Sequence, residues 1–310
     1  MSSSSLPGFA PQKITLRNSK KVTLRSVTPN DKEKCLGLRL AVYGASFQSE
    51  VWDWKYSERC PYPHDVLVVE AEEEVVAIQA MLVFPFMIGK RRVHALSLLD
   101  LMVHPAWRKQ GLFAHLIKRI ERELLNRFAF FYSFPNRRSF PGFIRRFGWL
   151  IPFHPTLMVR LALPKRVKKI PVETPHPSRP RVHLFKDQTY LDWRYSRPDM
   201  EYQRLSDRSV VAFQEHWKIK TAFAAEFSPQ EGEESSSLLK AMEQAAAAAP
   251  LVFLTNPTSP TFGLLKRNHF STRINLLRRF HLVVKMAPRH KELLQDLADW
   301  DLSFGDFDGI

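Results

Sequence analysis

The stretch LLDLMVHPAWRKQGLFAHLIKRIERE, residues 98–123, carries the residue types best suited to chemistry in this sequence. An apolar strand is predicted to end at His104-Pro105, and a basic turn containing Gly111 then leads into an amphipathic helix. The first amides of a helix have no intrahelical partner, and the helix dipole adds positive potential there. Because glycine lets the backbone approach a ligand closely, such a turn can hold a pyrophosphate. The alternative is an ordinary strand–turn–helix connection in which Gly111 only makes the corner.

Asp100 is the second chemical feature of this stretch, because it interrupts the apolar segment LSLLDLMV. Burying a lone carboxylate is unfavourable, so the residue needs a partner or a function. One interpretation is that Asp100 acts on the ammonium of a substrate, as a base or as a binding group. The other is that it pairs with a nearby arginine as a structural ion pair. The sequence leaves both interpretations open.

A mixed set of helices and strands is predicted to position these residues. Apolar periodicity predicts helices over 28–44 and 113–128, short helices at 51–57 and 141–148, and strands over 65–71, 74–89, 93–103, 129–134 and 156–163. The strands follow one another closely before the long helix. The order predicts an α/β (α+β) fold with a mixed, mostly antiparallel sheet flanked by helices.

An internal repeat links the two halves of the chain. The phrase DWKYS at 53–57 returns as DWRYS at 192–196, and FPNRRSFPGFIRRFGW at 134–149 is answered by TNPTSPTFGLLKRNHF at 255–270. The order of predicted elements after each phrase is also the same. We therefore expect two tandem α/β units that arose by duplication. In both phrases the Trp and Tyr are expected to pack onto the sheet, with the cation toward solvent or a cleft.

Composition shifts suggest four segments. These are a flexible N-terminal tail (1–21), a first unit (22–163), a Pro-rich basic linker (164–180) and a second unit (181–310). The second unit has an acidic loop, beginning near Glu226, where the first has its basic glycine turn. Carboxylates there would repel a pyrophosphate, so the second unit is expected to bind the acceptor or to be structural.

The charge balance narrows the partners. The formal net charge of +15 favours anionic ones, namely a phosphorylated cofactor, an acidic polymer, an acidic carrier protein, a membrane surface or nucleic acid. We do not expect nucleic acid, because no recognition motif accompanies the charge. Cys35 and Cys60 are the two cysteines, and no secretory signal or membrane-spanning run is evident, which favours the cytoplasm.

Three motifs together resemble the GNAT superfamily of acyl-CoA N-acyltransferases. The sequence has Val-His-Pro at 103–105 and Arg-Lys-Gln-Gly-Leu-Phe-Ala at 108–114, close to the family's Arg/Gln-x-x-Gly-x-Gly/Ala signature. Phe113 departs from the small residue of that signature and resembles a variant in a bacterial subgroup associated with surface-polysaccharide genes. The Trp-Lys-Tyr at 54–56 and the segment 134–149 are similar to the same subgroup. The resemblance covers 22–163 well and the second half more faintly.

The resemblance implies an acyl-CoA held between the strands at 93–103 and 129–134, with no metal. It implies that the cofactor's pyrophosphate meets the turn and that Asn136, beyond the second strand, faces the pantetheine arm. The cofactor-binding residues implied are Leu101, Met102, Val103, Arg108, Lys109, Gln110, Gly111, Leu112, Phe113, Ala114, Asn136 and Phe143.

The implied reaction is the transfer of an acetyl or longer acyl group to a primary amine. Asp100 matches the family's acidic base, and Tyr132 is the candidate acid because Phe143 stands where many relatives have a tyrosine. Family analogy suggests an amino sugar as acceptor, and an acyl carrier protein could replace CoA as donor. Phe113 and Phe143 favour the alternative, a non-catalytic binding or scaffold protein of the same fold.

Overall fold

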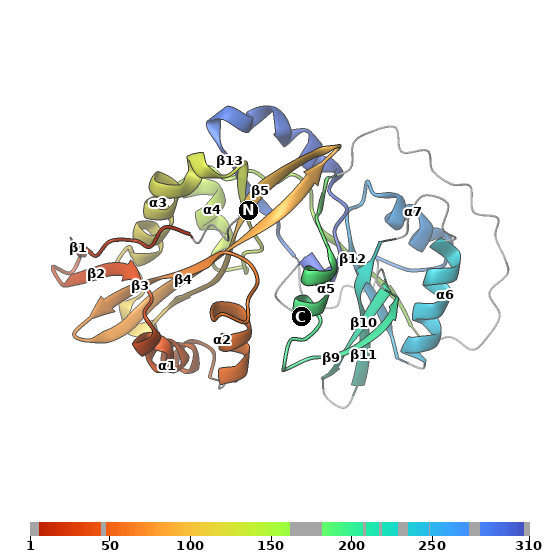
Figure 1. Ribbon diagram of the computed structural model, residues 1–310, viewed down its shortest axis with the longest axis horizontal. Helices are drawn as coiled ribbons and strands as arrows, with labels where there is room; N and C mark the ends of the chain where they lie inside the picture. The colour runs from red at the N-terminus through yellow and green to blue at the C-terminus, as the bar shows by residue number, and fades with distance from the viewer. Residues whose placement is uncertain are drawn as a thin grey trace.

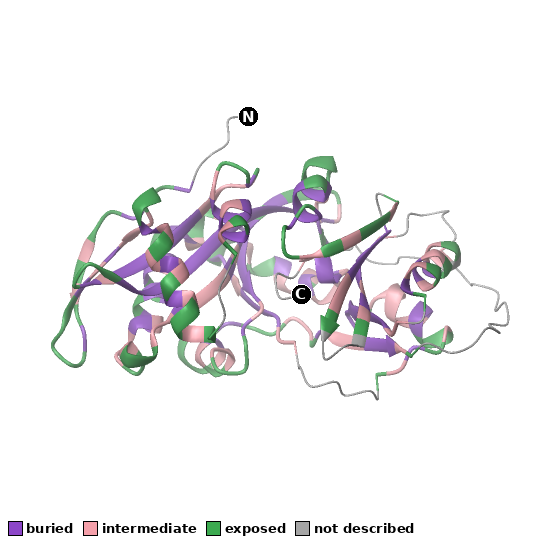
Figure 2. Cartoon of the chain, turned by 90° about the horizontal axis from the view of Figure 1, so that it is seen from below, coloured by how far each residue is buried: buried purple, intermediate pink, exposed green. Residues whose placement is uncertain are grey.

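The chain folds into two sheets with helices packed against them (Figure 1). The computed structural model describes residues 6–44, 48–161, 182–206, 209–216, 219–228, 235–247, 249–272 and 280–306. Within these residues the strands form an eight-stranded first sheet and a five-stranded second sheet. Buried residues concentrate along the strands, whereas exposed residues cover the outer surfaces of the helices (Figure 2).

The first sheet contains most of the strands predicted before residue 134. In sheet order its strands are β1 (Gln12–Thr15), β2 (Lys21–Ser26), β3 (His64–Ala71), β4 (Glu74–Ile88), β5 (Arg91–Val103), β6 (Phe130–Ser133) and β13 (Val283–Met286), with β8 (Val182–Leu184) beside β4. All neighbours pair antiparallel except β5 and β6, which pair parallel. The predicted mixed, mostly antiparallel sheet is therefore confirmed.

Helices cover both faces of the first sheet. They are α1 (Lys32–Tyr43) and α2 (Ser49–Tyr56) on one side, and α3 (Leu112–Leu124) and α4 (Phe140–Phe147) on the other. Alternation along β3 explains this arrangement, because Val66 and Val68 join the core under α1 and α2. Their neighbours Leu67 and Val69 join the core under α3 and α4. A strand with apolar residues on both faces requires a cover on each side.

The N-terminal residues correct one expectation. Residues 1–21 were expected to form a loose tail, yet Leu6, Phe9 and Leu16 are buried in the core under α3. Strand β1 also pairs with β2. The apolar residues of this segment were few and irregularly spaced, but they are enough to hold it on the sheet.

The second sheet has the order β7 (Thr156–Arg160), β12 (Leu251–Thr255), β11 (Ile219–Phe227), β10 (Ser209–His216) and β9 (Glu201–Ser206). Its helices are α5 (Gln188–Arg194), α6 (Ser235–Ala246) and α7 (Pro260–Arg267). Short 3-10 turns complete the described elements: η1 (Pro29–Asp31), η2 (Pro105–Trp107), η3 (Leu125–Arg127), η4 (Pro288–Leu294), η5 (Asp296–Asp299) and η6 (Phe304–Asp306). Strand β9 has mostly exposed or half-buried side chains, so its sequence lacked the apolar signal of the other strands.

The two sheets exchange their last strands. Strand β7, expected to close the first unit, instead pairs antiparallel with β12 of the second sheet. Conversely, β13 from near the C-terminus pairs antiparallel with β6 of the first sheet. The prediction that 156–163 completes the first sheet was therefore wrong. Both strands are apolar, and periodicity gives a strand's character without its partner.

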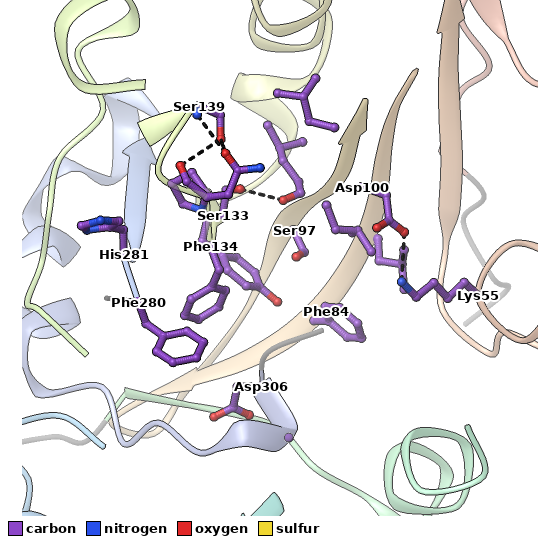
Figure 3. Close-up of a pocket in the computed structure, with 18 of the residues that line it drawn as sticks. Lys55, Phe84, Ser97, Asp100, Ser133, Phe134, Ser139, Phe280, His281 and Asp306 are labelled. Carbon is purple, nitrogen blue, oxygen red and sulfur yellow. Dashed lines mark hydrogen bonds and ion pairs between the residues drawn. The ribbon is translucent and has the colours of Figure 1, made fainter. Parts of the chain in front are cut away.

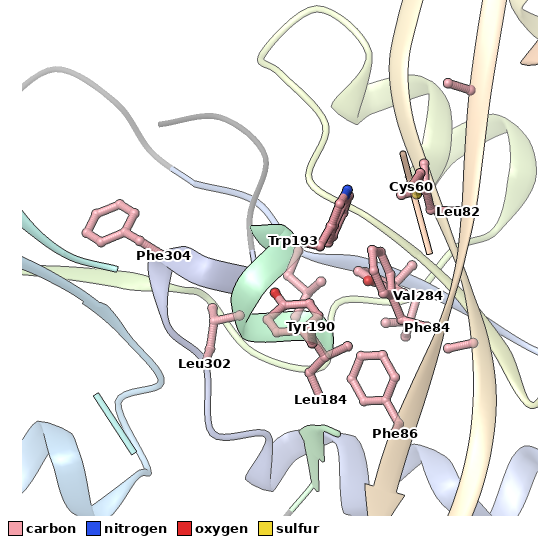
Figure 4. Close-up of a cluster of buried hydrophobic side chains, with 14 of the residues drawn as sticks. Cys60, Leu82, Phe84, Phe86, Leu184, Tyr190, Trp193, Val284, Leu302 and Phe304 are labelled. Atoms are coloured by element: carbon pink, nitrogen blue, oxygen red, sulfur yellow. The ribbon is translucent and has the colours of Figure 1, made fainter. Parts of the chain in front are cut away.

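One apolar core continues across the two units (Figure 4). At its centre Trp54 of α2 and Trp193 of α5 stack with ring centroids 4.7 Å apart and planes 12° from parallel. Each indole N–H donates to the backbone oxygen of the other tryptophan, at 2.7 Å from Trp54 and 3.0 Å from Trp193. The repeated phrase therefore forms a reciprocal contact between the units.

The predicted linker, 164–180, lies outside the described residues. So does most of the acidic loop of the second unit. The domain limits deduced from composition stay a prediction. The exchange of β7 and β13 means that each sheet contains a strand from the other unit's part of the chain.

Candidate active site

The site begins where β5 and β6 stop pairing. The parallel register runs from Ala95–Phe130 to Leu98–Ser133, after which β6 ends and β5 continues to Val103. The Ser133 hydroxyl donates to the Leu98 carbonyl at 2.8 Å and closes the last pair. Beyond this pair, no strand of the described residues lies beside the inner edge of β5. Backbone groups of such an edge are available to a ligand.

A bulge in β5 places Asp100 beside this opening. The register with β4 shifts between Ile78 and Ala80, and Asp100 has a positive φ of 48°. The side-chain amide of Gln79 donates to the Leu99 carbonyl at 2.7 Å and so satisfies the interrupted ladder. A non-glycine residue in the left-handed region is uncommon, and strain of this kind often accompanies a functional site.

A large cavity of about 1260 Å³ opens at this place and extends between the two units (Figure 3). Its first-unit wall comes from α1, α2 and strands β4 to β6, and its second-unit wall comes from α5 and the C-terminal segment. Among the predicted site residues, those lining it are Asp100, Leu101, Tyr132, Asn136 and Phe143. Residues that the sequence did not single out for the site include Arg39, Ser97, Ser133, Arg194 and His281.

Asp100 is held by three positively charged or hydroxyl groups. Lys55 Nζ lies 2.9 Å and Tyr56 Oη 2.7 Å from Asp100 Oδ2, and Arg39 Nη1 lies 3.8 Å from Oδ1. Burial alone would raise the pKa of Asp100. The charge of Lys55 and the hydrogen bonds outweigh burial and hold the pKa at about 2. The carboxylate is therefore ionised near neutral pH, and a free Asp100 would be a stronger base than this paired one.

The repeated phrase thus contributes a buried cation to the site. Lys55 lies on α2 with only 4% of its side chain exposed, and it lines the cavity. Both interpretations of Asp100 have a place in this geometry: the residue is ion-paired, mainly with a lysine, and it lines a cavity. Two features of the sequence could have pointed to Lys55. It lies in the repeated phrase DWKYS, and the isolated Asp100 needs a cationic partner.

The predicted pyrophosphate turn lies outside the cavity lining. Lys109 and Gly111 both have left-handed φ values, 66° and 94°, and α3 begins at Leu112. This conformation turns the chain sharply before the helix, as a glycine-containing anion-binding turn requires. Because Gly111 has no Cβ, it adopts its φ without strain. Arg108 and Gln110 belong to the same turn, where Arg108 is exposed and Gln110 half-buried.

The remaining implied cofactor residues are packed rather than open. Met102 and Ala114 are 3% exposed, and Leu112 is 1% exposed. Val103 packs against the core under α3. The buried side chains of Met102, Leu112 and Ala114 are therefore structural, whereas Val103 is only partly buried.

Phe113, the departure from the family signature, packs on α4. Its ring centroid lies 5.4 Å from that of Phe143 and 5.1 Å from that of Phe147. A Cβ on Gly142 would come within 2.4 Å of the Phe113 ring. The bulky residue on α3 is therefore accommodated by a glycine on α4, which explains how the turn tolerates it.

Tyr132 and Asn136 both line the cavity. Tyr132 is 2% exposed and its ring contacts Trp300, with centroids 5.4 Å apart. The side-chain oxygen of Asn136 accepts hydrogen bonds from the amides of Arg138 at 2.9 Å and Ser139 at 3.0 Å. Asn136 thus fixes the turn that leads into α4.

The second unit has its own buried charge cluster. Lys186 Nζ lies 2.8 Å from Glu226 Oε2 and 2.9 Å from Asp306 Oδ1. Tyr195 of the second phrase donates to Glu226 at 2.9 Å, as Tyr56 of the first phrase donates to Asp100. Asp306 lines the large cavity as well.

The described residues lack two further features, a cluster of metal ligands and a membrane-spanning helix. Among them, no three or more His, Cys, Asp and Glu side chains gather as a metal site would require. In the same part of the chain, no helix combines the length and apolarity needed to cross a membrane.

Comparison with known proteins identifies the first unit. Residues 23–151 match the family described as acetyltransferase (GNAT) domain. A search of curated proteins gives no match.

Solved structures share the fold over most of the chain. A probable N-acyltransferase from Enterococcus faecalis is 11% identical with a TM-score of 0.62, covering 86% of this chain and 73% of that one. A GCN5-related N-acetyltransferase from Anabaena variabilis is 11% identical with a TM-score of 0.61, covering 86% of this chain and 73% of that one. A second, from Kribbella flavida, is 15% identical with a TM-score of 0.59, covering 86% of this chain and 72% of that one. These likenesses establish a mixed α/β fold in two units. The family match covers residues 23–151, so the first unit is similar to a GNAT acetyltransferase domain.

Proposed function

We propose that this protein transfers an acetyl or longer acyl group from acyl-CoA to a primary amine bound between the two units. The observation that carries the proposal is the cavity of about 1260 Å³, which joins the opened end of β5 and β6 to a wall from the second unit. Such a volume accommodates more than the pantetheine arm of one cofactor. The second unit then serves as the acceptor side.

The donor would lie along the opened edge of β5. Leu101 and Asn136 line the cavity there, and the turn at 108–114 offers helix amides to the pyrophosphate. Met102 would contribute backbone groups only, because its side chain is buried in the core. An acyl carrier protein remains an alternative donor, since the chain's net charge of +15 favours an acidic partner.

The acceptor class rests on chemistry that the cavity can recognise. Its wall mixes aromatic rings, such as Phe134 and Phe280, with charged groups, such as Arg39 and Asp306. An amino sugar, which has apolar ring faces and polar edges, fits that mixture and agrees with the subgroup that the sequence resembles. Acyl-CoA supply also agrees with the cytoplasmic location expected from the sequence.

The chemistry requires an unprotonated amine, a positioned thioester and a proton for the leaving thiolate. In this proposal Asp100 holds Lys55 at the cavity wall and so keeps a cation near the reacting groups, while the buried Tyr56 donates a second hydrogen bond to the Asp100 carboxylate. Tyr132 is the candidate proton donor to the thiolate, because it lies on β6 and lines the cavity. Phe143 lines the cavity too, but its ring has no proton to give.

Calorimetric titration with acetyl-CoA tests the donor site. Gly111→Ala forces an L-residue into a φ of 94°. It should weaken acetyl-CoA binding about tenfold or more, because the backbone strain displaces the turn. The expected loss of binding free energy is comparable to that of one lost hydrogen bond. Gly37→Ala is the matched control, since nothing lies within 4 Å of a Cβ at that helical position.

The possible outcomes separate the functions. Micromolar binding that Gly111→Ala weakens and Gly37→Ala leaves unchanged supports the donor site. Binding that resists both variants would move the donor elsewhere. No binding of acetyl-CoA, CoA or a long-chain acyl-CoA would favour a carrier-protein donor or the scaffold alternative.

A further inference from the structure

The part of the chain that contains α3 and α4 carries a concentrated excess of positive charge. Residues 104–148 hold ten of the 46 lysines and arginines but only two of the 31 acidic residues. All of these basic side chains except the buried Arg119 are exposed. The excess therefore lies on the surface, where it acts on a partner in solution.

The two acidic residues offset little of this charge, because each already has a partner. Glu121 is half-buried and accepts a hydrogen bond from the indole of Trp149 at 2.6 Å. Glu123 lies 3.0 Å from both Arg119 and Arg122, so its charge is matched within α3.

Helices α3 and α4 place their cations on one surface, the basic face, formed by Lys118, Arg122, Arg145 and Arg146. His115, Lys118 and Arg122 follow one another on α3 at spacings of three and four residues, which puts them on one stripe. Helix α4, with the two arginines in its last turn, packs beside α3 (Figure 1). Burial lowers the pKa of His115, and the charges of Arg146 and Lys118 lower it further, as expected where cations of both helices lie close together.

The basic face adjoins the place where the donor is proposed to enter. Its stripe on α3 starts from the turn at Gly111. On the side of α4, Arg137 is exposed and lines the cavity, and Phe143 lines the cavity as well. A thioester arm that lies along the opened edge of β5 therefore has its outer end beside this face.

The basic face extends further than the phosphates of one cofactor can use. Lys118 and Arg122 lie about 10 and 16 Å along the helix axis from Gly111. A pyrophosphate at the start of α3 interacts little with charges at that separation, because salt screens surface charges over about 10 Å. The partner that matches the whole face is a macromolecule with many negative charges.

An acidic protein fits this face better than a lipid surface does. A helix that lies on a membrane needs an exposed apolar stripe beside its cations. The apolar stripes of α3 and α4 are instead buried, since Leu116, Ile120 and Phe147 are 6% exposed or less. Leu150 and Ile151, which follow α4, are exposed. A small apolar patch beside a charged rim is typical of protein–protein interfaces.

We propose that the basic face docks an acidic carrier protein, which delivers the acyl group as a thioester on its phosphopantetheine arm. This inference rests on the proposed acyltransferase function and names a protein partner for its donor site. Acetyl-CoA is then a smaller donor that uses the turn at Gly111 without the basic face.

The transfer from the carrier balances without a further reactant. The nitrogen of the unprotonated amine bonds to the thioester carbonyl carbon, and the carbon–sulfur bond breaks. The carrier's thiolate takes the proton that the nitrogen loses. The products are an amide and the free thiol of the carrier arm.

Calorimetry with a bacterial acyl carrier protein, its arm loaded with an acetyl thioester, tests the docking. The Kd should rise about tenfold or more between about 50 and 300 mM salt, because salt screens the charges that attract the carrier. The double variant Lys118→Glu/Arg146→Glu should raise the carrier Kd about tenfold or more at low salt. Its Kd for acetyl-CoA should stay within about threefold, because the small donor does not use these side chains.

A matched control reverses the same number of charges elsewhere. Lys240→Glu/Arg267→Glu changes one exposed cation on each of α6 and α7, the corresponding helices of the second unit. Its carrier Kd should stay within about twofold of the wild type, because the net charge changes equally but the face is intact. Lys118→Gln/Arg146→Gln is a milder variant in case the charge reversal does not fold, and it should show a smaller rise in Kd. Far-UV circular dichroism checks the fold of each variant.

Three results would overturn the docking proposal. The first is a carrier Kd that rises equally in the two charge-reversal variants, which would mean that only net charge matters. The second is the absence of carrier binding by the wild type. The third is binding to vesicles of phosphatidylglycerol and phosphatidylcholine in place of the carrier, which would assign the face to a membrane.

Failure of the proposed function gives a different result. Thiol release is measured with acetyl-CoA and the acetylated carrier as donors and with tyramine and D-glucosamine as acceptors. Carrier binding that depends on the basic face, without acyl transfer from either donor, would remove the proposed function and support the docking. Acyl transfer from acetyl-CoA without carrier binding would do the reverse.

Discussion

The two units are alike where a parallel strand pair ends, at β5 and β6 in the first unit and at β11 and β12 in the second. They differ in what lies beyond that end. In both, a parallel strand pair is followed by an Asn-containing turn into a short helix, α4 or α7. In the first unit the place beyond the pair opens into the cavity. In the second, the chain's own C-terminal segment lies against it, with η6 on β11 and the Asn256 amide donating to the Ala298 and Trp300 carbonyls.

This difference suggests how one fold can form a binding site in the first unit and a structural wall in the second. The Asn136 turn leaves its side chain exposed at the cavity, whereas Asn256 is fully buried under the C-terminal segment. Gly305 completes the closure, because a Cβ there would come within 2.8 Å of the Ala225 carbonyl oxygen. A cleft filled by its own chain cannot bind a cofactor, but it can hold Asp306 in the neighbouring cavity.

The largest effect is expected at the contact that both units share. Trp54→Ala or Trp193→Ala should each lower the free energy of unfolding by about 3–5 kcal/mol, because a buried indole and its hydrogen bond are lost. The double variant should lose less than the sum, since either change removes the same stack. Urea denaturation measures all three.

Trp107→Ala is the control, because Trp107 is only partly buried and contacts Lys20 rather than the other unit. Its loss should be smaller. Strict additivity of Trp54→Ala and Trp193→Ala would contradict a reciprocal contact between the units.

The two asparagines should respond in opposite ways. Asn256→Ala should destabilise the protein by about 1–3 kcal/mol, because two buried carbonyls lose their donor. Asn136→Ala should be milder in stability, since its side chain is exposed, but should weaken acetyl-CoA binding. Chemical denaturation and calorimetry give the two quantities for each variant. Equal stability losses with equal binding would remove the distinction between an open and a closed cleft.

The tyrosines of the two repeated phrases, Tyr56 and Tyr195, allow a finer comparison of the two units. Tyr56→Phe and Tyr195→Phe each remove a hydroxyl that donates to a carboxylate, Asp100 or Glu226. Each should cost about 1–2 kcal/mol of stability, because hydrogen bonds to charged groups are worth about that. Only Tyr56→Phe should also lower the rate of acyl transfer at saturating acetyl-CoA. A rate loss in Tyr195→Phe of the same size would place both carboxylates in the reaction.

The smallest effect is a difference in acid sensitivity. Asp100 has its pKa lowered from 3.8 to about 2, so its ion pair stabilises the native state above pH 4 and is lost as pH falls toward 2. Asp306 has its pKa raised, so the native state binds its proton first and its contribution favours folding as pH falls. Asp100→Asn should therefore flatten the loss of stability below pH 4, and Asp306→Asn should steepen it. Denaturation from pH 6 to 2.5 tests both signs, and identical slopes would show that neither carboxylate is coupled to folding.

Much of the fold followed from local pattern. Apolar alternation and helical spacing located β3, β4, β5 and α3 to within a few residues. The glycine turn before α3 was predicted from Gly111 and its basic neighbours, and it has the left-handed φ that only glycine adopts freely. These features depend on residues near one another in the chain, so the sequence alone determines them.

The tertiary structure decided which strands pair and which distant side chains meet. The exchange of β7 and β13 could not be predicted, because an apolar strand pairs equally well with any compatible edge. Lys55 meets Asp100, 45 residues away, only because α2 packs under a bulge in β5. Asp306 reaches the cavity because Gly305 fits between Tyr195 and Ala225. Local periodicity specifies which elements form, whereas the site depends on distant side chains whose contacts are set by how those elements pack.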